Sequence, residues 1–233
     1  MNQVNEEKFF FPTLNWKYLS YSWGTSSPVY GNGKKIEIKK ERDLCCGDTC
    51  NTLLFSASNH VGTHFDFPLH FDQNGKNVLD YEASYFIHVK ISIIKMNLDT
   101  GHLISISDLK EKEKEIANDT TLLLIDTGSS IYRNQEKYWK NGIGVNTGVA
   151  DYLREKYPEL TTIGLDTISI SSFQNREIGR LVHKEFLCSP KPILIIEDLN
   201  LNGINNIKPK IIVSLPLRIE NADGAPATVI VGY

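Results

Sequence analysis

The chain has 233 residues, of which 41% are hydrophobic and 23% are charged. This composition predicts a globular protein with a substantial core, organised as a single domain over residues 1–233. The formal net charge of −3 gives no electrostatic basis for binding nucleic acid or an anionic membrane.

The chain offers no sequence signal for a membrane or for secretion. No apolar stretch approaches the ~20 residues that a membrane-spanning helix needs. Residues 1–16 lack the basic and then apolar pattern of a secretory signal. We therefore expect a cytoplasmic protein with a small-molecule substrate and no nucleic-acid or membrane partner.

Four cysteines are present, and three of them fall within one short stretch: Cys45, Cys46, Cys50 and Cys188. Their spacing is not Cys-x2-Cys and no second pair exists, so a zinc knuckle is not expected. Reduced thiols in a cytosolic protein are the simplest interpretation. A bridge to Cys50, or a thiol that lines a pocket, remains open.

The first elements in chain order are a loop and two short strands. Residues 14–34 contain Pro28 and the turn at 31–33, and they carry Trp23 and Tyr30. These two rings either pack on the core or form a wall for an aromatic substrate. Strands are predicted at 36–40 and 52–58.

The next stretch, residues 60–71, carries the chemistry. His60, His64, Asp66 and His70 occupy even positions, and large apolar residues occupy the odd positions 61, 65, 67, 69 and 71. This period of two indicates an extended segment, because a helix would turn Asp66 away and would break at Pro68. The spacing His-x3-His-x-Asp-x3-His indicates a metal site, and imidazole favours zinc or manganese over calcium.

A straight strand cannot bring these side chains to one ion. At a rise of ~3.3 Å per residue, His60 and His70 would lie roughly 33 Å apart, whereas bonds to a transition metal are about 2.0–2.2 Å long. Gly62 permits a bend and Pro68 fixes another change of direction. We therefore predict a strand that runs into a bent loop.

Further strands and helices follow the motif. Alternation predicts a strand over 86–94, with His88 on its less apolar face and hence at the surface; His102 is expected in a surface turn. Ser107 is the predicted N-cap of a charged helix that ends at Ala117. Residues 121–126 form a strand that is apolar throughout, which is typical of burial on both faces.

The second half of the chain continues this alternation. Helices are predicted over 146–157 and 179–187, strands over 162–166 and 193–197, a loop over 168–176, and a C-terminal hairpin with arms at 210–219 and 227–232. Helix 179–187 carries His183. Glu197 ends a strand at its carboxyl end, where open α/β sheets place ligands. Taken alone, His183 is better explained as a partly buried histidine, and Glu197 as a carboxylate at the end of a strand in solvent.

The stretch His60–Phe71 resembles the signature of the metal-dependent cyclase family, which includes bacterial kynurenine formamidase and isatin hydrolase. A run near the C-terminus, Leu-Pro-Leu-Arg followed by Asp-Gly-Ala-Pro, is also similar, so the resemblance spans about residues 18–230. It implies an α/β fold, a swivelling β/β/α single domain with a mixed sheet core, assembled as a homo-oligomer, either a dimer or a tetramer.

The resemblance also implies roles for individual residues. The metal ligands are His60, His64, Asp66, His183 and Glu197, with Asp66 and Glu197 bridging two ions. Tyr30 stands where kynurenine formamidase tends to have tryptophan, in a segment that contacts substrate, and Trp23 belongs to the same aromatic loop.

This ligand set predicts a catalytic site. A closed structural zinc site uses four Cys or His ligands, whereas three histidines with two carboxylates suit an open site or two ions ~3.5–4 Å apart. A bound ion lowers the pKa of water toward ~7 and polarises a carbonyl. His70 is the predicted proton carrier, since a free histidine has a pKa near ~6.5; its alternative role is a sixth ligand.

The predicted reaction is metal-dependent hydrolysis of an amide-type C–N bond in a small, aromatic substrate. The resemblance offers an aryl formamide such as N-formylkynurenine or a lactam such as isatin. The cofactor is a divalent metal, Zn or Mn, at one to two ions per chain. The alternatives are a cyclase or lactonase of the same family, and a non-catalytic metal-binding module with an occluded site.

Overall fold

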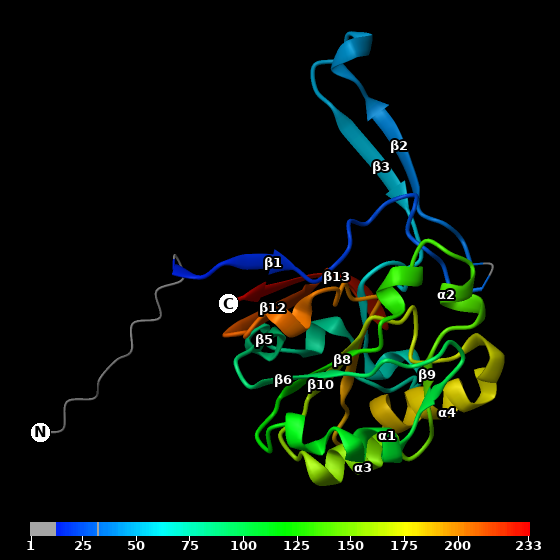
Figure 1. Ribbon diagram of the computed structural model, residues 1–233. Coiled ribbons are helices and arrows are strands. Elements are labelled where there is room, and N and C mark those ends of the chain that lie inside the picture. The colour runs from blue at the N-terminus through cyan, green and yellow to red at the C-terminus, as the bar shows by residue number, and fades with distance from the viewer. Residues whose placement is uncertain (1–12, 32) are drawn as a thin grey trace, which may run out of the picture.

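The fold is built on one large mixed sheet. The structure, a computed structural model, describes residues 13–31 and 33–233. Nine strands make up this sheet, in the order β5-β12-β13-β4-β11-β10-β8-β6, with β1 paired to β13 (Figure 1). They are β1 (Trp16–Tyr18), β4 (His64–Asp66), β5 (Ile87–His88), β6 (Ile91–Lys95), β8 (Leu122–Asp126), β10 (Thr162–Leu165), β11 (Leu194–Glu197), β12 (Ile211–Pro216) and β13 (Gly224–Gly232). The prediction of an α/β fold with a mixed sheet core is confirmed.

The centre of the sheet is parallel and buried. Strands β6, β8, β10 and β11 run parallel to one another, and every residue of β8, β10 and β11 is buried. Strand β4 then joins this parallel half to the antiparallel half, because it pairs antiparallel with both β11 and β13. Burial of these apolar strands on both faces explains why their sequences lack the alternation of a half-exposed strand.

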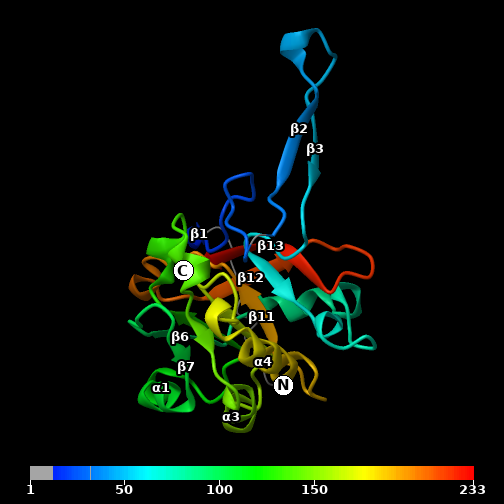
Figure 2. The ribbon, with the colours of Figure 1, turned by 90° about the vertical axis from the view of Figure 1, so that its right-hand side faces the viewer.

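The helices gather beside the parallel half of the sheet. Figures 1 and 2 show α1 (Ile106–Glu111), α3 (Val149–Lys156) and α4 (Arg176–Leu187) on the same side of it, while the short α2 (Lys137–Lys140) lies elsewhere. Helices α3 and α4 pack against each other. Helix α4 buries Val182, Phe186 and Leu187 as an apolar face, and this face also carries His183.

The helix boundaries differ from those predicted. The N-cap of helix α1 is Ser105, two residues before the expected Ser107, because the Ser105 hydroxyl accepts from the Asp108 amide while the Asp108 carboxylate accepts from the Ser105 amide. The helix ends at Glu111 and is followed by a single 3-10 turn over residues 113–115. Helix α3 starts only after Gly148, whose φ of 80° lies in the left-handed region. Helix α4 starts at Arg176, three residues earlier than predicted.

The strand predicted over 86–94 is two strands with different partners. Strand β5 pairs with β12 and β6 pairs with β8. His88 was predicted at the surface and this is wrong: it is 2% exposed, because it lies opposite Ile212 on the β5–β12 pair. Its Nε2 has no hydrogen-bond partner among the residues that the structure describes.

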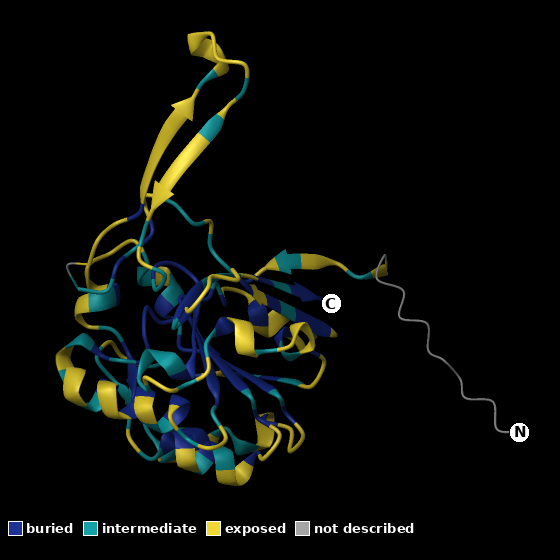
Figure 3. Ribbon diagram, turned by 180° about the vertical axis from the view of Figure 1, so that it is seen from behind, coloured by how far each residue is buried: buried dark blue, intermediate teal, exposed yellow. Residues whose placement is uncertain are grey.

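Two small sheets lie outside the main one. Strands β7 (Leu103–Ile104) and β9 (Gly144–Val145) pair in parallel. Strands β2 (Glu37–Arg42) and β3 (Thr52–Ser56) form an antiparallel hairpin, here called the arm, that stands away from the body (Figures 1 and 3). Nearly all of the arm is exposed, including Ile38, Leu53 and Phe55, which share one face of the hairpin.

All four cysteines are free thiols, and Cys45, Cys46 and Cys188 are exposed. The bridge to Cys50 that the sequence left open is therefore not formed. Within the described residues, no helix combines the length and apolarity needed to cross a membrane. Most of the segment that bears on a secretory signal, residues 1–12, and residue 32 of the predicted turn lie outside the described residues.

Candidate metal centre and active site

The histidine motif bends as predicted, but only three of its residues are a strand. Gly62 adopts a φ of 77°, and a Cβ there would lie 2.9 Å from Cδ1 of Trp23. Strand β4 covers His64–Asp66, and Pro68 then opens a 3-10 turn that ends at His70. The two bends fold the stretch so that its three histidines and Asp66 reach the same cavity.

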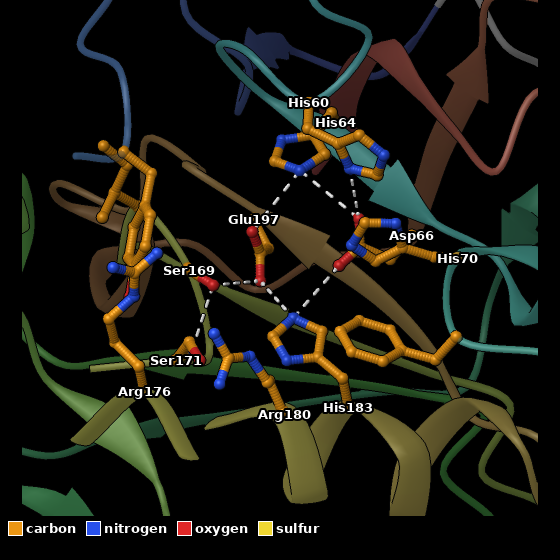
Figure 4. Close-up of a pocket in the computed structure, with 13 residues that line it drawn as sticks. His60, His64, Asp66, His70, Ser169, Ser171, Arg176, Arg180, His183 and Glu197 are labelled. Carbon is orange, nitrogen blue, oxygen red and sulfur yellow. Dashed lines mark hydrogen bonds and ion pairs between the residues drawn. The ribbon is translucent and has the colours of Figure 1, made fainter. Parts of the chain in front are cut away.

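This cavity has a volume of about 270 Å³. All five predicted ligands and His70 line it (Figure 4). Glu197 arrives because β11 runs beside β4, with Glu197 opposite His64 in the register. His183 projects from α4 on the other side. The full lining consists of Tyr30, His60, His64, Asp66, His70, Phe71, Ile168, Ser169, Ser171, Arg176, Arg180, His183 and Glu197.

The spacing of the ligand atoms around His64 and His183 fits a metal better than direct hydrogen bonds, whereas His60 Nδ1 lies at hydrogen-bond distance, 2.8 Å, from Asp66 Oδ1. His64 Nε2 lies 3.4 Å from both Asp66 Oδ1 and Glu197 Oε2. His183 Nε2 lies 3.5 Å from both Asp66 Oδ2 and Glu197 Oε1. Direct N–H···O bonds are about 2.7–3.2 Å long, whereas two atoms bound to one tetrahedral ion at about 2.1 Å lie roughly 3.4 Å apart.

The atoms form two overlapping groups, His60–His64–Asp66 and Asp66–His183–Glu197. Asp66 turns one oxygen toward His64 and the other toward His183, and Glu197 does the same. Imidazole and carboxylate together are a donor set for a divalent transition metal. The residues present therefore fit the metal that the sequence predicts.

Backbone carbonyls fix the ring of each buried histidine. His64 Nδ1 lies 2.8 Å from the Gly62 carbonyl oxygen, and His183 Nδ1 lies 2.7 Å from that of Gly179. A carbonyl only accepts, so each Nδ1 carries the proton and donates. In the neutral ring, Nε2 is then left with a lone pair that faces the carboxylates, which is the arrangement of a histidine ligand.

The cluster buries two carboxylates. Asp66 is 1% exposed and Glu197 is 3% exposed. Burial lowers the pKa of His183, but the nearby carboxylates of Asp66 and Glu197 outweigh it and raise that pKa to about 10. Burial raises the pKa of Asp66, yet the contacts with His183 and His60 hold it well below its usual range. Positive charge is thus required here, and it can come from protons or from metal ions.

The end of β11 is held by a buried ion pair. Arg133 donates to both carboxylate oxygens of Asp198, with N–O distances of 2.8 and 2.6 Å, and the Tyr138 hydroxyl donates to Oδ1 at 2.7 Å. Asp198 itself has a φ of 53°. Glu197 accepts from the Ser169 hydroxyl at 3.0 Å and the Ile170 amide at 2.8 Å. These contacts place the Glu197 carboxylate between the two histidines.

Asp223 connects His60 with His70, and sequence reasoning missed it. Its Oδ2 lies 3.0 Å from His60 Nε2 and 2.6 Å from His70 Nδ1, while its Oδ1 accepts from Asn59 Nδ2 at 2.7 Å. Because His70 uses Nδ1 for this bond, its Nε2 is available to the cavity. His60, His70 and Asp223 also form a third group that could hold an ion. Both predicted roles of His70, proton carrier and sixth ligand, therefore remain predictions.

The signal for Asp223 was its place in the Asp-Gly-Ala-Pro run. The neighbouring Gly224 has a packing role, because a Cβ there would lie 2.3 Å from Cε1 of His60. Only glycine lets β13 pass this closely beside the imidazole.

The aromatic loop supplies one wall of the cavity. Tyr30 lines it, with its ring 5.6 Å from that of Phe173. Burial raises the pKa of the Tyr30 hydroxyl, against the effect of Arg176. Trp23 is not among the lining residues: its Nε1 donates to the Val61 carbonyl at 2.9 Å, and its ring packs edge-on against Phe55 of the arm at 5.3 Å. Substrate contact by either ring stays a prediction.

Sequence reasoning also missed two arginines. Arg176 and Arg180 both line the cavity from α4. Arg180 follows Arg176 by four residues, and His183 follows Arg180 by three. This helical spacing could have identified the two arginines as neighbours of His183. The predicted helix begins at residue 179, however, and so leaves Arg176 out.

The comparison with known proteins decides the family. Residues 18–172 match the model of the Cyclase family ("Putative cyclase"). The chain belongs to the Cyclase family. It is 31% identical over 177 residues to a kynurenine formamidase of Bacillus thuringiensis subsp. konkukian, covering 76% of this chain and 77% of that protein. It is 26% identical over 211 residues to a kynurenine formamidase of Geobacillus thermodenitrificans, covering 91% and 94%.

Solved structures agree with this Cyclase-family assignment at the level of the fold. Isatin hydrolase A from Labrenzia aggregata, bound to benzyl benzoate, has a TM-score of 0.75 at 18% identity and covers 94% of this chain and 93% of its own. A "potential metal-dependent hydrolase with cyclase activity" has a TM-score of 0.72 at 21% identity and covers 94% and 98%. The predicted family and its hydrolytic enzyme class are therefore confirmed.

Proposed function

We propose that this Cyclase-family enzyme hydrolyses an amide-type C–N bond in a small aromatic substrate with the help of a divalent metal. The observation that carries the proposal is the buried cluster of His64, Asp66, His183 and Glu197. Its nitrogens and oxygens stand 3.4–3.5 Å apart, and it opens into a cavity that also presents His70.

The metal is Zn or Mn in this proposal, at one to two ions per chain. Imidazole with carboxylate suits either ion. The division of the Asp66 and Glu197 oxygens between two histidines supports two ions, since each carboxylate turns one oxygen toward His64 and the other toward His183.

When bound, a divalent ion supplies polarisation of the carbonyl and activation of water. The chain supplies the rest. In the neutral form that binds metal, His64 and His183 would present unprotonated Nε2 atoms in fixed orientations. His70, with Nδ1–H donated to Asp223, holds its Nε2 ready to take a proton and to return it to the leaving nitrogen. Tyr30 borders the space for a ring.

Two kinds of substrate are proposed: an aryl formamide such as N-formylkynurenine and a lactam such as isatin. The names of the relatives, kynurenine formamidase and isatin hydrolase, support this choice. A cavity of about 270 Å³ suits a molecule of one or two rings. A non-catalytic metal module would have an occluded site, whereas this cluster borders a cavity that also holds His70.

We also propose that the enzyme is a cytoplasmic homo-oligomer, either a dimer or a tetramer. Its exposed free thiols suit a reducing compartment. The apolar face of the arm, with Ile38, Leu53 and Phe55 exposed at 37%, 61% and 63%, supports contact with a second copy of the chain.

The test is metal content by elemental analysis, paired with hydrolysis of N-formylkynurenine and isatin before and after chelation. About one to two Zn or Mn per chain with chelator-sensitive turnover is the expected result. Metal without turnover of either compound would reject the proposed substrates. A purified protein that binds no metal would reject the whole proposal.

A further inference from the structure

Two guanidinium groups of the cavity have no charged partner. Arg176 and Arg180 both line the cavity and both are exposed. Neither forms an ion pair with any residue in the part of the chain that the structure describes. The Arg176 guanidinium lies 5.2 Å from the centroid of the Phe173 ring. Two arginines outside the cavity, Arg133 and Arg154, are by contrast paired with Asp198 and Asp151.

The two arginines share a face of α4 with a predicted metal ligand. Residues 176, 180 and 183 are spaced by four and three, so their side chains project from the same side of the helix. With a rise of 1.5 Å per residue, Arg180 and Arg176 begin about 4.5 and about 10.5 Å before His183 along the axis. Figure 4 shows both side chains extending from α4 toward the cavity, on the side where Ser169 and Ser171 lie.

The local structure brings hydroxyls to the same place. A Cβ on Gly179 would lie 1.5 Å from the Ser171 hydroxyl oxygen, so glycine alone lets the 168–172 loop pack on the first turns of α4. Ser171 thereby joins Arg176 and Arg180 in the cavity wall, beside Tyr30. The N-terminal end of α4, which has no side-chain cap, adds the positive potential of the helix dipole.

Charge balance then selects the ligand. The acidic groups of the cavity, Asp66 and Glu197, are buried against His64 and His183 and belong to the metal cluster. A divalent ion there would leave no net negative charge to balance the two guanidinium groups. Guanidinium forks bind carboxylates and phosphates with paired, charge-assisted hydrogen bonds.

We propose that Arg176 and Arg180 bind an anionic group, a carboxylate or a phosphate, of the substrate whose amide carbonyl lies at the metal cluster. This inference rests on the proposed function and narrows it. An aryl formamide with a carboxylate, as in N-formylkynurenine, is preferred over a neutral lactam such as isatin.

The test compares substrates that differ only in this charge. N-formylanthranilate and its methyl ester share the aryl formamide, and the corresponding arylphosphonate separates phosphate-type from carboxylate recognition. The variants are Arg176→Gln, Arg180→Gln, the double variant and Arg180→Lys. Lys184→Gln is the matched control, because Lys184 is an exposed cation of the same helix that does not line the cavity.

We expect the wild type to prefer an anion over the ester in kcat/KM. In the double variant, the ratio of kcat/KM for the anion to kcat/KM for the ester should fall about tenfold to hundredfold. The fall should come mainly from a higher KM for the anion, since hydrogen bonds to a charged group are lost. Arg180→Lys should recover part of the loss, and Lys184→Gln should keep the wild-type ratio. A wild type without preference, or a double variant that retains it, would overturn the inference.

A binding measurement separates this inference from the proposed function. Benzoate, phenylphosphonate and neutral benzamide are titrated into each metal-loaded protein by calorimetry. Any direct contact of the anion with metal is common to all variants, so the difference between the wild type and the double variant isolates the arginines. Anion binding that the double variant loses supports the inference even if no formamide is hydrolysed. Chelator-sensitive hydrolysis of the ester, without arginine-dependent anion binding, would keep the proposed function and reject the inference.

Discussion

His64 and His183 are prepared for metal by contacts that do not involve metal. Each donates Nδ1–H to a carbonyl of its own segment, two residues earlier for His64 and one helical turn earlier for His183. Their Nε2 atoms are directed at the same two carboxylates. Such orientation lowers the cost of assembling the site when a ligand arrives.

His70 is expected to serve turnover and not metal retention. His70→Ala should keep its metal and lose about 10²- to 10⁴-fold in kcat, because a positioned proton carrier contributes this much. Elemental analysis and steady-state kinetics on the same preparation check both parts. His102→Ala, which removes a histidine of a surface turn outside the cavity lining, is the control. Loss of metal from His70→Ala would reassign this residue as a ligand.

Asp223 is expected to position both His60 and His70. Asp223→Asn keeps the size of the side chain but removes its negative charge. It also leaves only one oxygen to accept hydrogen bonds from His60, His70 and Asn59. We expect metal affinity and kcat each to fall about 10- to 100-fold, as for other carboxylates that orient ligand histidines. Competition with a chelating dye measures the affinity. Unchanged values of both quantities would show that Asp223 has no such role.

The residue scale also shows where sequence reasoning succeeds and where it stops. His60, His64 and Asp66 could be predicted because they lie within seven residues of one another and their spacing is specific. Asp223 contacts His70 across 153 residues of chain. The Asp-Gly-Ala-Pro run marks Asp223 by its resemblance to the family, but its spacing does not reveal which residue it contacts. Arg176 was assigned to a loop, because the helix start was predicted three residues too late.

Among the elements, β4 decides the geometry of the site. It is only three residues long, and it lies between β11 and β13, which bring Glu197 and the Asp223 turn to it. The alternating pattern of residues 60–71 predicted a longer strand, but tight bends at Gly62 and Pro68 replace its ends. Buried apolar strands were predicted well because they are continuous runs, whereas helix ends depend on capping contacts that propensity does not reveal.

The close passage of β13 gives an element-scale prediction. Gly224→Ala would place a methyl group 2.3 Å from Cε1 of His60, so either the strand or the imidazole must move. We expect weaker metal binding and a loss of stability of about 1–3 kcal/mol, as for other overpacked sites. Urea unfolding and a metal titration measure the two effects. Gly24→Ala is the control, since nothing lies within 4 Å of a Cβ at that position.

The burial of His88 in β5 gives a prediction about pH. Burial lowers the pKa of His88 to about 4, below the ~6.5 of an unfolded chain. The unfolded chain therefore binds an extra proton between these values, and the folded state loses stability as pH falls from about 6.5 toward 4.

Replacing His88 by leucine should make the free energy of unfolding less dependent on pH in this range. Urea unfolding of chelated protein across the same pH range provides the measurement. His102→Leu removes a histidine that is less buried and should leave the slope in place. A His88→Leu protein with the wild-type slope would show that another group controls it.

For the whole molecule, the arm is the feature that the body does not explain. It is a two-stranded hairpin with an apolar face open to solvent, and an isolated hairpin of this kind is marginally stable. Register pairs Ile38 with Phe55, and Trp23 at the base of the arm touches the Phe55 ring. The proposed second copy of the chain would cover this face.

Phe55→Lys is expected to weaken the oligomer. A charge on the apolar face would oppose its burial, so light scattering coupled to gel filtration should show a shift toward monomer. Ser56→Lys places the same charge on the opposite face of the same strand and should leave the mass unchanged. A Phe55→Lys protein with the wild-type mass would place the interface elsewhere.

The contact between Trp23 and the metal motif gives the chain an optical reporter. The indole covers Gly62 and donates to the carbonyl of Val61, the residue next to His60. Only three tryptophans are present, and Trp16 is 41% exposed. A shift of the 60–62 bend on metal entry would change the surroundings of Trp23 directly, so intrinsic fluorescence, compared with that of a Trp23→Phe protein, can follow metal loading in real time and without a label.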